Sequence, residues 1–231
     1  MRVDPTRLLR GLGLLAWALF FDYLWLGDKA ATYIGPRTTW VVTFGGITLT
    51  LVALVYLAST ISRRPGTPLT AAEVGRLGVI VAPLLLAVMV PAVSLGAQAV
   101  GQKRTADGAT SLARLGDYDG EIRLYELAAA AFDKNWAAQR GIKAGLKVQF
   151  DGFVSRPARD GQEEVSRFMA TCCAADAVPY SVQVKQPADA LDFKTNQWVL
   201  VRGTVTADPK RSFVITADRI DAADRPSNPY G

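Results

Sequence analysis

The sequence predicts a membrane protein of mixed architecture, in which three transmembrane helices precede a small all-β domain. Residues 1–100 contain three long apolar runs, the rest of the chain contains none, and apolar residues alternate with polar ones from residue 146 onward. We therefore expect a membrane anchor over residues 1–100, a linker with an amphipathic helix over 101–144, and a β-domain over 145–225.

The apolar runs cover residues 8–26, 38–61 and 77–100. Each is close to the roughly 20 residues that a helix needs to cross about 30 Å of hydrocarbon, where only a helix satisfies its own backbone polar groups. The first run is rich in Trp and Phe and lacks a small-x-small cleavage site, which indicates a retained anchor rather than a signal peptide. Asp22 near its end is either exposed at the interface or part of a transport path.

Lys and Arg in the short segments predict the orientation. The segment between the first two runs carries only Lys29 and Arg37. The N-terminal tail and the segment between the last two runs carry three arginines each, namely Arg2, Arg7, Arg10, Arg63, Arg64 and Arg76. The positive-inside rule therefore predicts a multi-pass protein of the cell membrane, with a cytoplasmic N-terminus and an extracytoplasmic C-terminal domain.

Most of the formal net charge of +5 comes from the membrane anchor, where the arginines set the predicted orientation. Residues 1–100 carry eight Lys or Arg against four Asp or Glu, whereas residues 101–231 carry 18 against 17. A domain so close to neutral lacks the basic stripe that phosphate binding needs, so we expect no nucleic-acid partner. The chain has no histidine, which excludes Ser-His-Asp and Cys-His catalysis within it and removes the commonest metal ligand.

An amphipathic helix is expected over most of residues 121–140, with a strand as the alternative for the first few of them, and five short strands follow. The strands are expected at residues 146–154, 164–172, 181–185, 198–206 and 213–220. Short strands separated by Gly and Pro are typical of a small barrel or sandwich. The stretch 198–220 is similar to the last hairpin of many OB-type barrels, which predicts an OB-like five-stranded barrel but carries no function by itself.

The two cysteines of the chain, Cys172 and Cys173, are adjacent. A thiolate pair can bind a soft metal ion such as Zn or Cu, with Asp176 as a further ligand, and it can also cycle as a vicinal disulfide or bond to a partner. In the structural alternative, strand alternation buries one small apolar cysteine while the other faces outward, or an inert bond forms outside the cell. A shared site requires the strand to end at or before Cys172, because adjacent strand residues face opposite sides.

Arg167 and Asp176 bracket the cysteines. They either form an ion pair that closes the strand end or contact an anion or another ligand beside the thiols. Two thiols without histidine leave a tetrahedral metal site short of ligands, so such a site needs carboxylates or a partner.

Three segments of the second half, VQFDGFVSRP, SRFMATCCAADAVPYSVQV and QWVLVRGTV, resemble the YcgQ-type family of bacterial membrane proteins. The resemblance covers most of residues 10–220 and is most specific over 167–177. It implies an N-terminal membrane anchor, and a role as the second, accessory component of a permease system beside a separate many-helix permease. It brings no catalytic residues with it.

The expected function is therefore an accessory subunit of a membrane permease system. Its extracytoplasmic domain would bind or present a solute, with a metal ion as one candidate, or regulate the permease. The alternative is a membrane-tethered thiol-disulfide oxidoreductase that uses the cysteine pair. The candidate ligand-binding residues are Cys172, Cys173, Asp176 and Arg167, and the first three are the candidate metal ligands.

Overall fold

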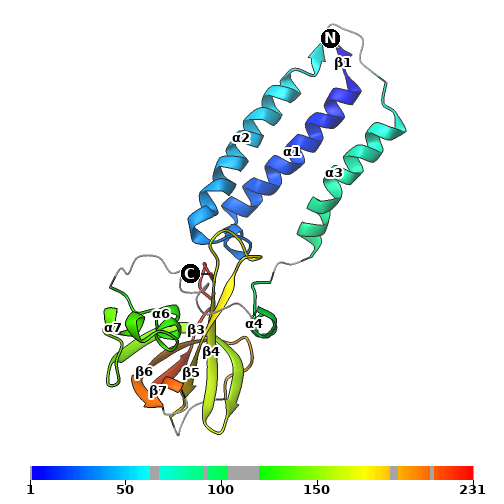
Figure 1. Ribbon diagram of the computed structural model, residues 1–231. Coiled ribbons are helices and arrows are strands. Elements are labelled where there is room, and N and C mark those ends of the chain that lie inside the picture. Colours follow the sequence, from blue (N-terminus) through cyan, green and yellow to red (C-terminus); the bar gives the residue numbers. More distant parts are fainter. Residues whose placement is uncertain are drawn as a thin grey trace. The chain divides into compact units, whose positions relative to one another are not determined.

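The computed structural model describes residues 2–62, 68–90, 93–103, 120–187, 192–208 and 211–230. The chain divides into two compact units, Met1–Val93 and Ser94–Gly231. The first unit consists mainly of helices, and the second is built around a five-stranded sheet (Figure 1). The structure confirms the prediction of three apolar helices followed by a small β-unit.

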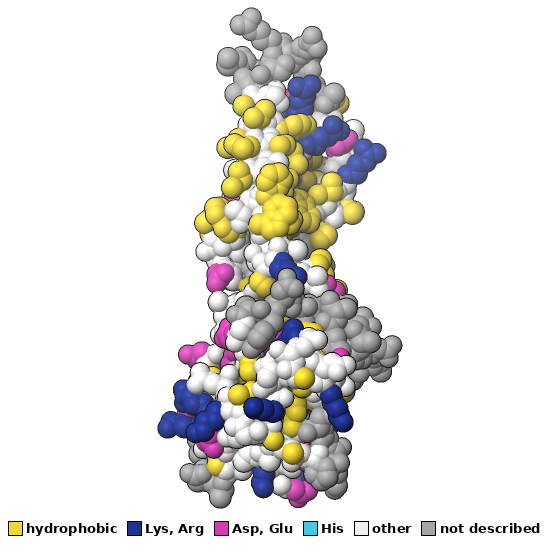
Figure 2. Space-filling model, turned by 60° about the vertical axis from the view of Figure 1, so that its left-hand side comes forward, with side chains coloured by type: hydrophobic (Ala, Val, Ile, Leu, Met, Phe, Trp, Pro, Cys, Tyr) yellow, Lys and Arg dark blue, Asp and Glu magenta, His cyan; other side chains and the backbone are white. Residues whose placement is uncertain are grey.

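Three helices of the first unit are long and apolar enough to cross a membrane: α1 (Pro5–Leu26), α2 (Thr39–Ala58) and α3 (Ala71–Met89). Hydrophobic side chains cover much of their surface, whereas Lys and Arg gather toward one end (Figure 2). At most 22% of the apolar window of any of the three is buried within the protein. Helices that are apolar on their exposed faces fit insertion into a lipid bilayer.

The third helix lies earlier in the chain than the predicted run over residues 77–100. It begins after Thr70, whose hydroxyl accepts the backbone N–H of Glu73 at 3.3 Å. It ends at Met89, since Val90 is extended with φ −95° and ψ 107°, as expected near Pro91. Residues Ala97–Lys103 form a separate helix, α4, in the second unit. The boundary between the units therefore lies at Val93 rather than at residue 100.

Small residues let α1 and α2 pack closely. A Cβ atom at Gly11 would lie 2.5 Å from a methyl carbon of Leu57, and one at Gly46 would lie 2.8 Å from Oδ1 of Asp22. The other carboxylate oxygen of Asp22 accepts the Thr50 hydroxyl at 3.1 Å. Asp22 therefore lies against α2 inside the anchor. Two short strands, β1 (Arg2–Val3) and β2 (Ile61–Ser62), pair antiparallel, and two 3₁₀ turns, η1 (Ala30–Thr32) and η2 (Pro36–Thr38), precede α2.

The second unit contains the five predicted strands: β3 (Lys147–Arg159), β4 (Gln162–Met169), β5 (Val178–Lys185), β6 (Trp198–Asp208) and β7 (Arg211–Ala222). Their order is β3-β4-β5-β7-β6, and β6 pairs back with β3, so the sheet closes into a ring. Every pair is antiparallel except β5 with β7, which is parallel.

Alternate residues of the strands form the core of the ring. Fully buried members are Val154, Val165, Val184, Val199, Val201 and Ile215. The helix α6 (Leu124–Ala130) adds Leu124 and Leu127 to this core. Burying apolar surface in this way is the main force that holds the ring together.

The prediction of one continuous helix over residues 121–140 is wrong, because two helices lie there. The second, α7 (Lys134–Gln139), begins at Asp133, whose carboxylate accepts the backbone N–H groups of Asn135 and Trp136 at 2.8 and 3.2 Å. Because the aspartate caps a new helix, the chain forms two short helices where the apolar spacing had suggested one.

A second apolar cluster lies on the other face of β3 and β4. It contains Phe153, Phe168, Trp198, Tyr230 and Val100 of α4, together with Ala170 and Ala177, which flank the segment with the cysteines. Trp198 is 9% exposed, and its ring centroid lies 5.7 Å from that of Phe153. This cluster packs α4 against the base of that segment.

Candidate functional site

The two cysteines lie in a loop of residues 170–177, which we call the cysteine loop. The strand β4 ends at Met169, ahead of both cysteines. A site shared by both thiols needs the strand to end at or before Cys172, and this condition is met. Cys172 is exposed, Cys173 is partly exposed, and the two are not joined in a disulfide. The structural alternative, in which a strand buries one of them, is wrong because neither lies on a strand.

Asp176 fixes the backbone of the cysteine loop. Its two carboxylate oxygens accept the backbone N–H groups of Cys172 at 3.0 Å and of Cys173 at 3.2 Å. Its own N–H donates to the carbonyl oxygen of Cys173 at 3.0 Å. Asp176 thus turns back toward the cysteines, as the sequence suggested, but these bonds reach their backbone nitrogens. A carboxylate that accepts local N–H groups in this way stabilises a tight turn.

Lys103, the last residue of α4, holds the other side of the loop. Its Nζ atom lies 3.1 Å from the carbonyl oxygen of Ala174, 2.9 Å from that of Ala175 and 3.1 Å from that of Ala177. An ammonium group has three donors, which matches three carbonyl acceptors. The contacts join residues 71 to 74 positions apart, and no local sequence signal could have indicated them.

Arg167 does not form the predicted ion pair with Asp176. Its ion pair is with Asp151 of β3, at 2.5 Å, and its guanidinium also donates to the carbonyl oxygen of Asn228 at 3.2 Å. The guanidinium carbon lies 5.8 Å from the centre of the Trp198 ring. Arg167 sits on β4 across from β3, so Asp151 is its neighbour in the sheet, and these contacts give it a structural role beside the second apolar cluster.

Within the described residues, no group of three or more His, Cys, Asp or Glu side chains is placed to hold a metal ion. Cys172, Cys173 and Asp176 therefore do not close a tetrahedral site together. What the cysteine loop offers is two adjacent thiols, and soft sulfur ligands favour ions such as Cu(I) or Zn(II). Additional ligands for such an ion would come from another molecule.

The electrostatic surroundings of the thiols favour a cation over a free thiolate. The hydrogen bond with the Cys173 thiol, followed by the charge of that group, raises the pKa of Cys172, and burial and Asp176 raise it further. Because the thiolate is the nucleophile in thiol-disulfide exchange, a raised pKa slows that chemistry near neutral pH. The same negative surroundings favour a cation that replaces the thiol protons.

A serine-rich polar network, missed in the sequence, lies on β3, β4 and β5. The Ser155 hydroxyl lies 2.7 Å from Oε1 of Glu164 and 2.7 Å from Ser166, whose hydroxyl lies 2.7 Å from that of Ser181. Gln183 donates to Oε2 of Glu164 at 3.0 Å. The signal was available in the alternate polar positions of β4 and β5. A connected network of this kind specifies the strand register and needs no ligand to satisfy it.

Glu163 is a second group that sequence reasoning missed. It is 1% exposed, on the same side of β4 as the core residue Val165. Gln186 donates to its Oε2 at 3.2 Å, whereas Oε1 is buried without a hydrogen-bond partner among the described residues. Burial raises the pKa of Glu163 to about 7, with the hydrogen bond from Gln186 acting in the opposite direction. The Glu-Glu dipeptide in the sequence gave no sign that one carboxyl is buried.

Residues 141–231 match the DUF1980 C-terminal domain. The matched region contains all five strands of the ring and the cysteine loop, which is compatible with the YcgQ-type resemblance but does not confirm that name. No curated protein matches the chain.

Several solved structures are weakly similar. The S. pombe Stn1-ten1 complex shows 15% identity and a TM-score of 0.28, over 47% of this chain and 80% of that chain. Asparaginyl-tRNA synthetase from Pyrococcus horikoshii shows 18% identity and a TM-score of 0.25, over 37% and 23%. The small single-stranded DNA-binding protein from Streptomyces coelicolor shows 14% identity and a TM-score of 0.25, over 35% and 95%. Similarities this weak carry no argument about this chain.

Proposed function

We propose that this chain is a membrane-anchored accessory subunit of a permease system, whose β-unit presents a thiol pair to a soft metal ion. One observation carries the proposal: Cys172 and Cys173 are adjacent, exposed or partly exposed, and not joined in a disulfide, in a loop whose backbone is bound by Asp176 and Lys103. These contacts of Asp176 and Lys103 reach backbone atoms of the loop, so they do not occupy either sulfur atom. A pre-organised pair of soft ligands lowers the entropy cost of binding an ion.

The anchor supports the accessory role. Its three helices are mainly apolar, and the resemblance of the chain to the YcgQ-type family implies a separate many-helix permease as the partner. Ligands that the thiol pair lacks would then come from that partner, which suits a subunit that receives and hands over an ion. The arginine distribution supports a cytoplasmic N-terminus and an extracytoplasmic β-unit.

The proposal includes an OB-like barrel for the ring. In an OB barrel the first strand pairs with the second and fourth, and the third and fifth strands are parallel. Here the order β3-β4-β5-β7-β6 closes in the same way, and β5 with β7 is the parallel pair. The near-neutral charge of the β-unit supports a binding surface for something other than nucleic acid.

The second candidate function is a membrane-tethered thiol-disulfide oxidoreductase, favoured by two adjacent cysteines that are not joined in a disulfide. The raised pKa of Cys172 argues against it, because such enzymes need a thiolate near neutral pH.

The test is to purify the full chain from its own membranes in a mild detergent, followed by elemental analysis and mass spectrometry of bound proteins. Wild type is compared with the double variant Cys172→Ser, Cys173→Ser and with Thr171→Ser, an exposed control in the same loop. We expect copper or zinc with wild type and the control, no metal with the double variant, and the same many-helix partner with all three.

Each part of the proposal would be contradicted by a different result. Metal content that does not change in the double variant would remove the thiols from the site. Purification without a polytopic partner would remove the accessory role. A disulfide that forms and reopens readily under mild redox buffers would favour the oxidoreductase.

A further inference from the structure

A groove with a cavity volume of ≈ 470 Å³ lies between α1 and α3 of the anchor, and Tyr56 of α2 also lines it. Its apolar lining consists of Leu9, Leu14, Trp17, Leu77 and Ile80. Its charged lining consists of Arg10, Glu73 and Arg76. The volume is in the range of pockets that hold small molecules.

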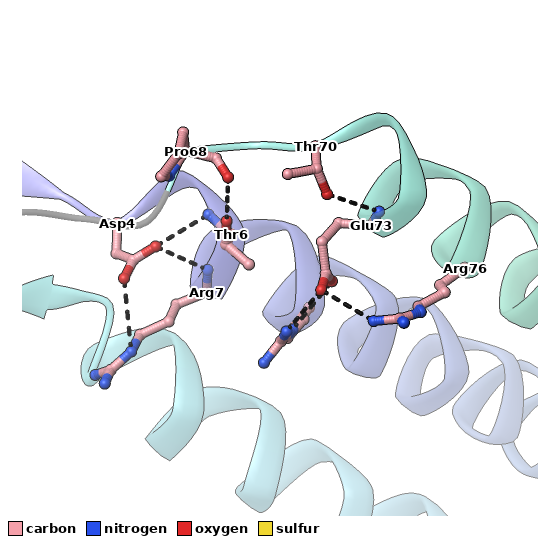
Figure 3. Close-up of polar contacts among 8 residues, drawn as sticks. Asp4, Thr6, Arg7, Pro68, Thr70, Glu73 and Arg76 are labelled. Atoms are coloured by element: carbon pink, nitrogen blue, oxygen red, sulfur yellow. Dashed lines mark hydrogen bonds and ion pairs between the residues drawn. The ribbon is translucent and has the colours of Figure 1, made fainter.

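Charged and apolar linings occupy different levels of the groove. Arg10 bonds to Glu73 at 3.0 Å, and the Trp17 indole N–H donates to the carbonyl oxygen of Ile80 at 3.2 Å. Both pairs are 63 positions apart, so α1 and α3 run parallel in register. The charged residues therefore lie near the N-terminal ends of both helices, and the apolar ones lie further along them. Figure 3 shows the charged end, with Glu73 and Arg76 close to Thr70 at the start of α3.

Two guanidinium groups share one carboxylate at this end. Oε1 of Glu73 lies 3.0 Å from Arg10 and 3.3 Å from Arg76. The arginine side chains are 55% and 73% exposed, whereas that of Glu73 is 17% exposed. Arg10 uses two nitrogens on Glu73 and has the Tyr56 side chain as a further partner, and Arg76 uses one nitrogen, so each guanidinium keeps some of its five N–H donors for a further acceptor. The end of the groove therefore carries a net positive charge.

We propose that this groove binds one anionic phospholipid. Its phosphate lies between Arg10 and Arg76, because guanidinium groups match phosphate oxygens in geometry and charge. One acyl chain lies along Leu14, Trp17 and Ile80. A lipid fits this order of linings because it has a charged head and an apolar tail, whereas an apolar partner helix would bury the exposed arginines at a cost. Basic pockets between transmembrane helices bind anionic head groups in this way.

The proposal is tested by native mass spectrometry of the full chain in detergent, titrated with equal amounts of phosphatidylglycerol and phosphatidylcholine. We expect wild type to retain phosphatidylglycerol preferentially. The double variant Arg10→Gln, Arg76→Gln should lose about 30-fold of this preference, equivalent to about 2 kcal/mol at about 1 kcal/mol per basic residue. The control Arg37→Gln removes an exposed arginine that does not line the groove and should keep the preference.

Two further variants separate binding from folding. Arg10→Lys with Arg76→Lys keeps the charge and should retain part of the preference, and Leu14→Trp keeps both arginines but fills the tail region and should lower lipid retention. A photo-reactive residue in place of Ile80 should label lipid. An unchanged preference in the double Gln variant, an equal loss in Arg37→Gln, or labelling of polypeptide alone would each overturn the proposal.

Discussion

Glu163 predicts how the stability of the β-unit depends on pH. The substitution Glu163→Gln keeps the size of the side chain and an oxygen that accepts the hydrogen bond from Gln186, but it removes the titrating group. The carboxyl is 1% exposed, so its charge is not screened by water in the folded state. We therefore expect the two proteins to differ most at the pH values where wild type has to bury a negative charge.

The magnitude follows from the two pKa values of the carboxyl. It is about 7 in the folded protein, against an ordinary value of 4.5 in the unfolded chain. Between these values the folded state holds a proton that the unfolded state has released, so wild type loses about 1.4 kcal/mol of stability per pH unit as pH rises. The loss amounts to about 3 kcal/mol in all. Below pH 4.5 both states are protonated, and above pH 7 both are ionised, so the contribution is constant there.

The assay is pulse proteolysis of the full chain in detergent over a urea series at pH 5, 6, 7 and 8. We expect Glu163→Gln to become more stable relative to wild type as pH rises, by about 2.5 kcal/mol between pH 5 and 8, which corresponds to a midpoint shift of about 1–2.5 M urea. The control is Asp160→Asn in the turn between β3 and β4. Asp160 is exposed, and asparagine tolerates its positive φ of 53°.

A difference between Glu163→Gln and wild type that does not vary with pH would refute the argument, since it would mean that the carboxyl titrates near its ordinary pKa. The same slope in Asp160→Asn would show that the pH dependence belongs to the detergent system.

Three further outcomes are expected. Lys103→Met should loosen the backbone of the cysteine loop, because three carbonyl contacts are lost. Hydrogen exchange of the loop amides should become at least about tenfold faster, as a charged hydrogen bond contributes about 1.5–3 kcal/mol, whereas Lys134→Met, an exposed change, should leave it unaltered. Gly203→Ala should destabilise the ring by about 1–3 kcal/mol in urea unfolding, since a Cβ there would lie 2.4 Å from the carbonyl oxygen of Thr216, and unchanged stability would contradict this packing. In a cysteine-free chain, Ser227→Cys should react with a membrane-impermeant label in intact cells, and labelling only after lysis would reverse the proposed orientation.

The sequence predicted the strands well because their pattern is local. Burial alternates over residues 147–152 of β3 and 199–206 of β6, so period-two spacing was enough to find these strands. The ends were less certain because they depend on single side chains. The strand β4 was expected to reach Cys172 but stops at Met169, where Asp176 begins to satisfy the loop backbone instead.

The parts that the sequence could not predict depend on contacts between distant residues. Arg167 was paired with Asp176 on the basis of proximity along the chain, yet the sheet places it beside Asp151. Lys103 belongs to a segment that was assigned to the membrane anchor and linker, and its contact with the loop depends on where α4 packs. Glu163 was unremarkable in the sequence, because its burial follows from which face of β4 turns inward.

The cysteine loop combines exposed thiols with a fixed backbone. The bonds that fix the backbone are not made by the sulfur atoms, so each can be changed without the other. Asp176 accepts the two cysteine N–H groups, Lys103 donates to three carbonyl oxygens, and the N–H of Ala170 donates to the carbonyl oxygen of Tyr230 at 3.3 Å. None of these bonds uses sulfur, so replacing both cysteines with serine should leave the loop in place. A lost metal in that variant would then report on the thiols, whereas Lys103→Met perturbs the loop and leaves both thiols intact. Together the two substitutions distinguish a site that needs only two sulfurs from one that also needs their geometry.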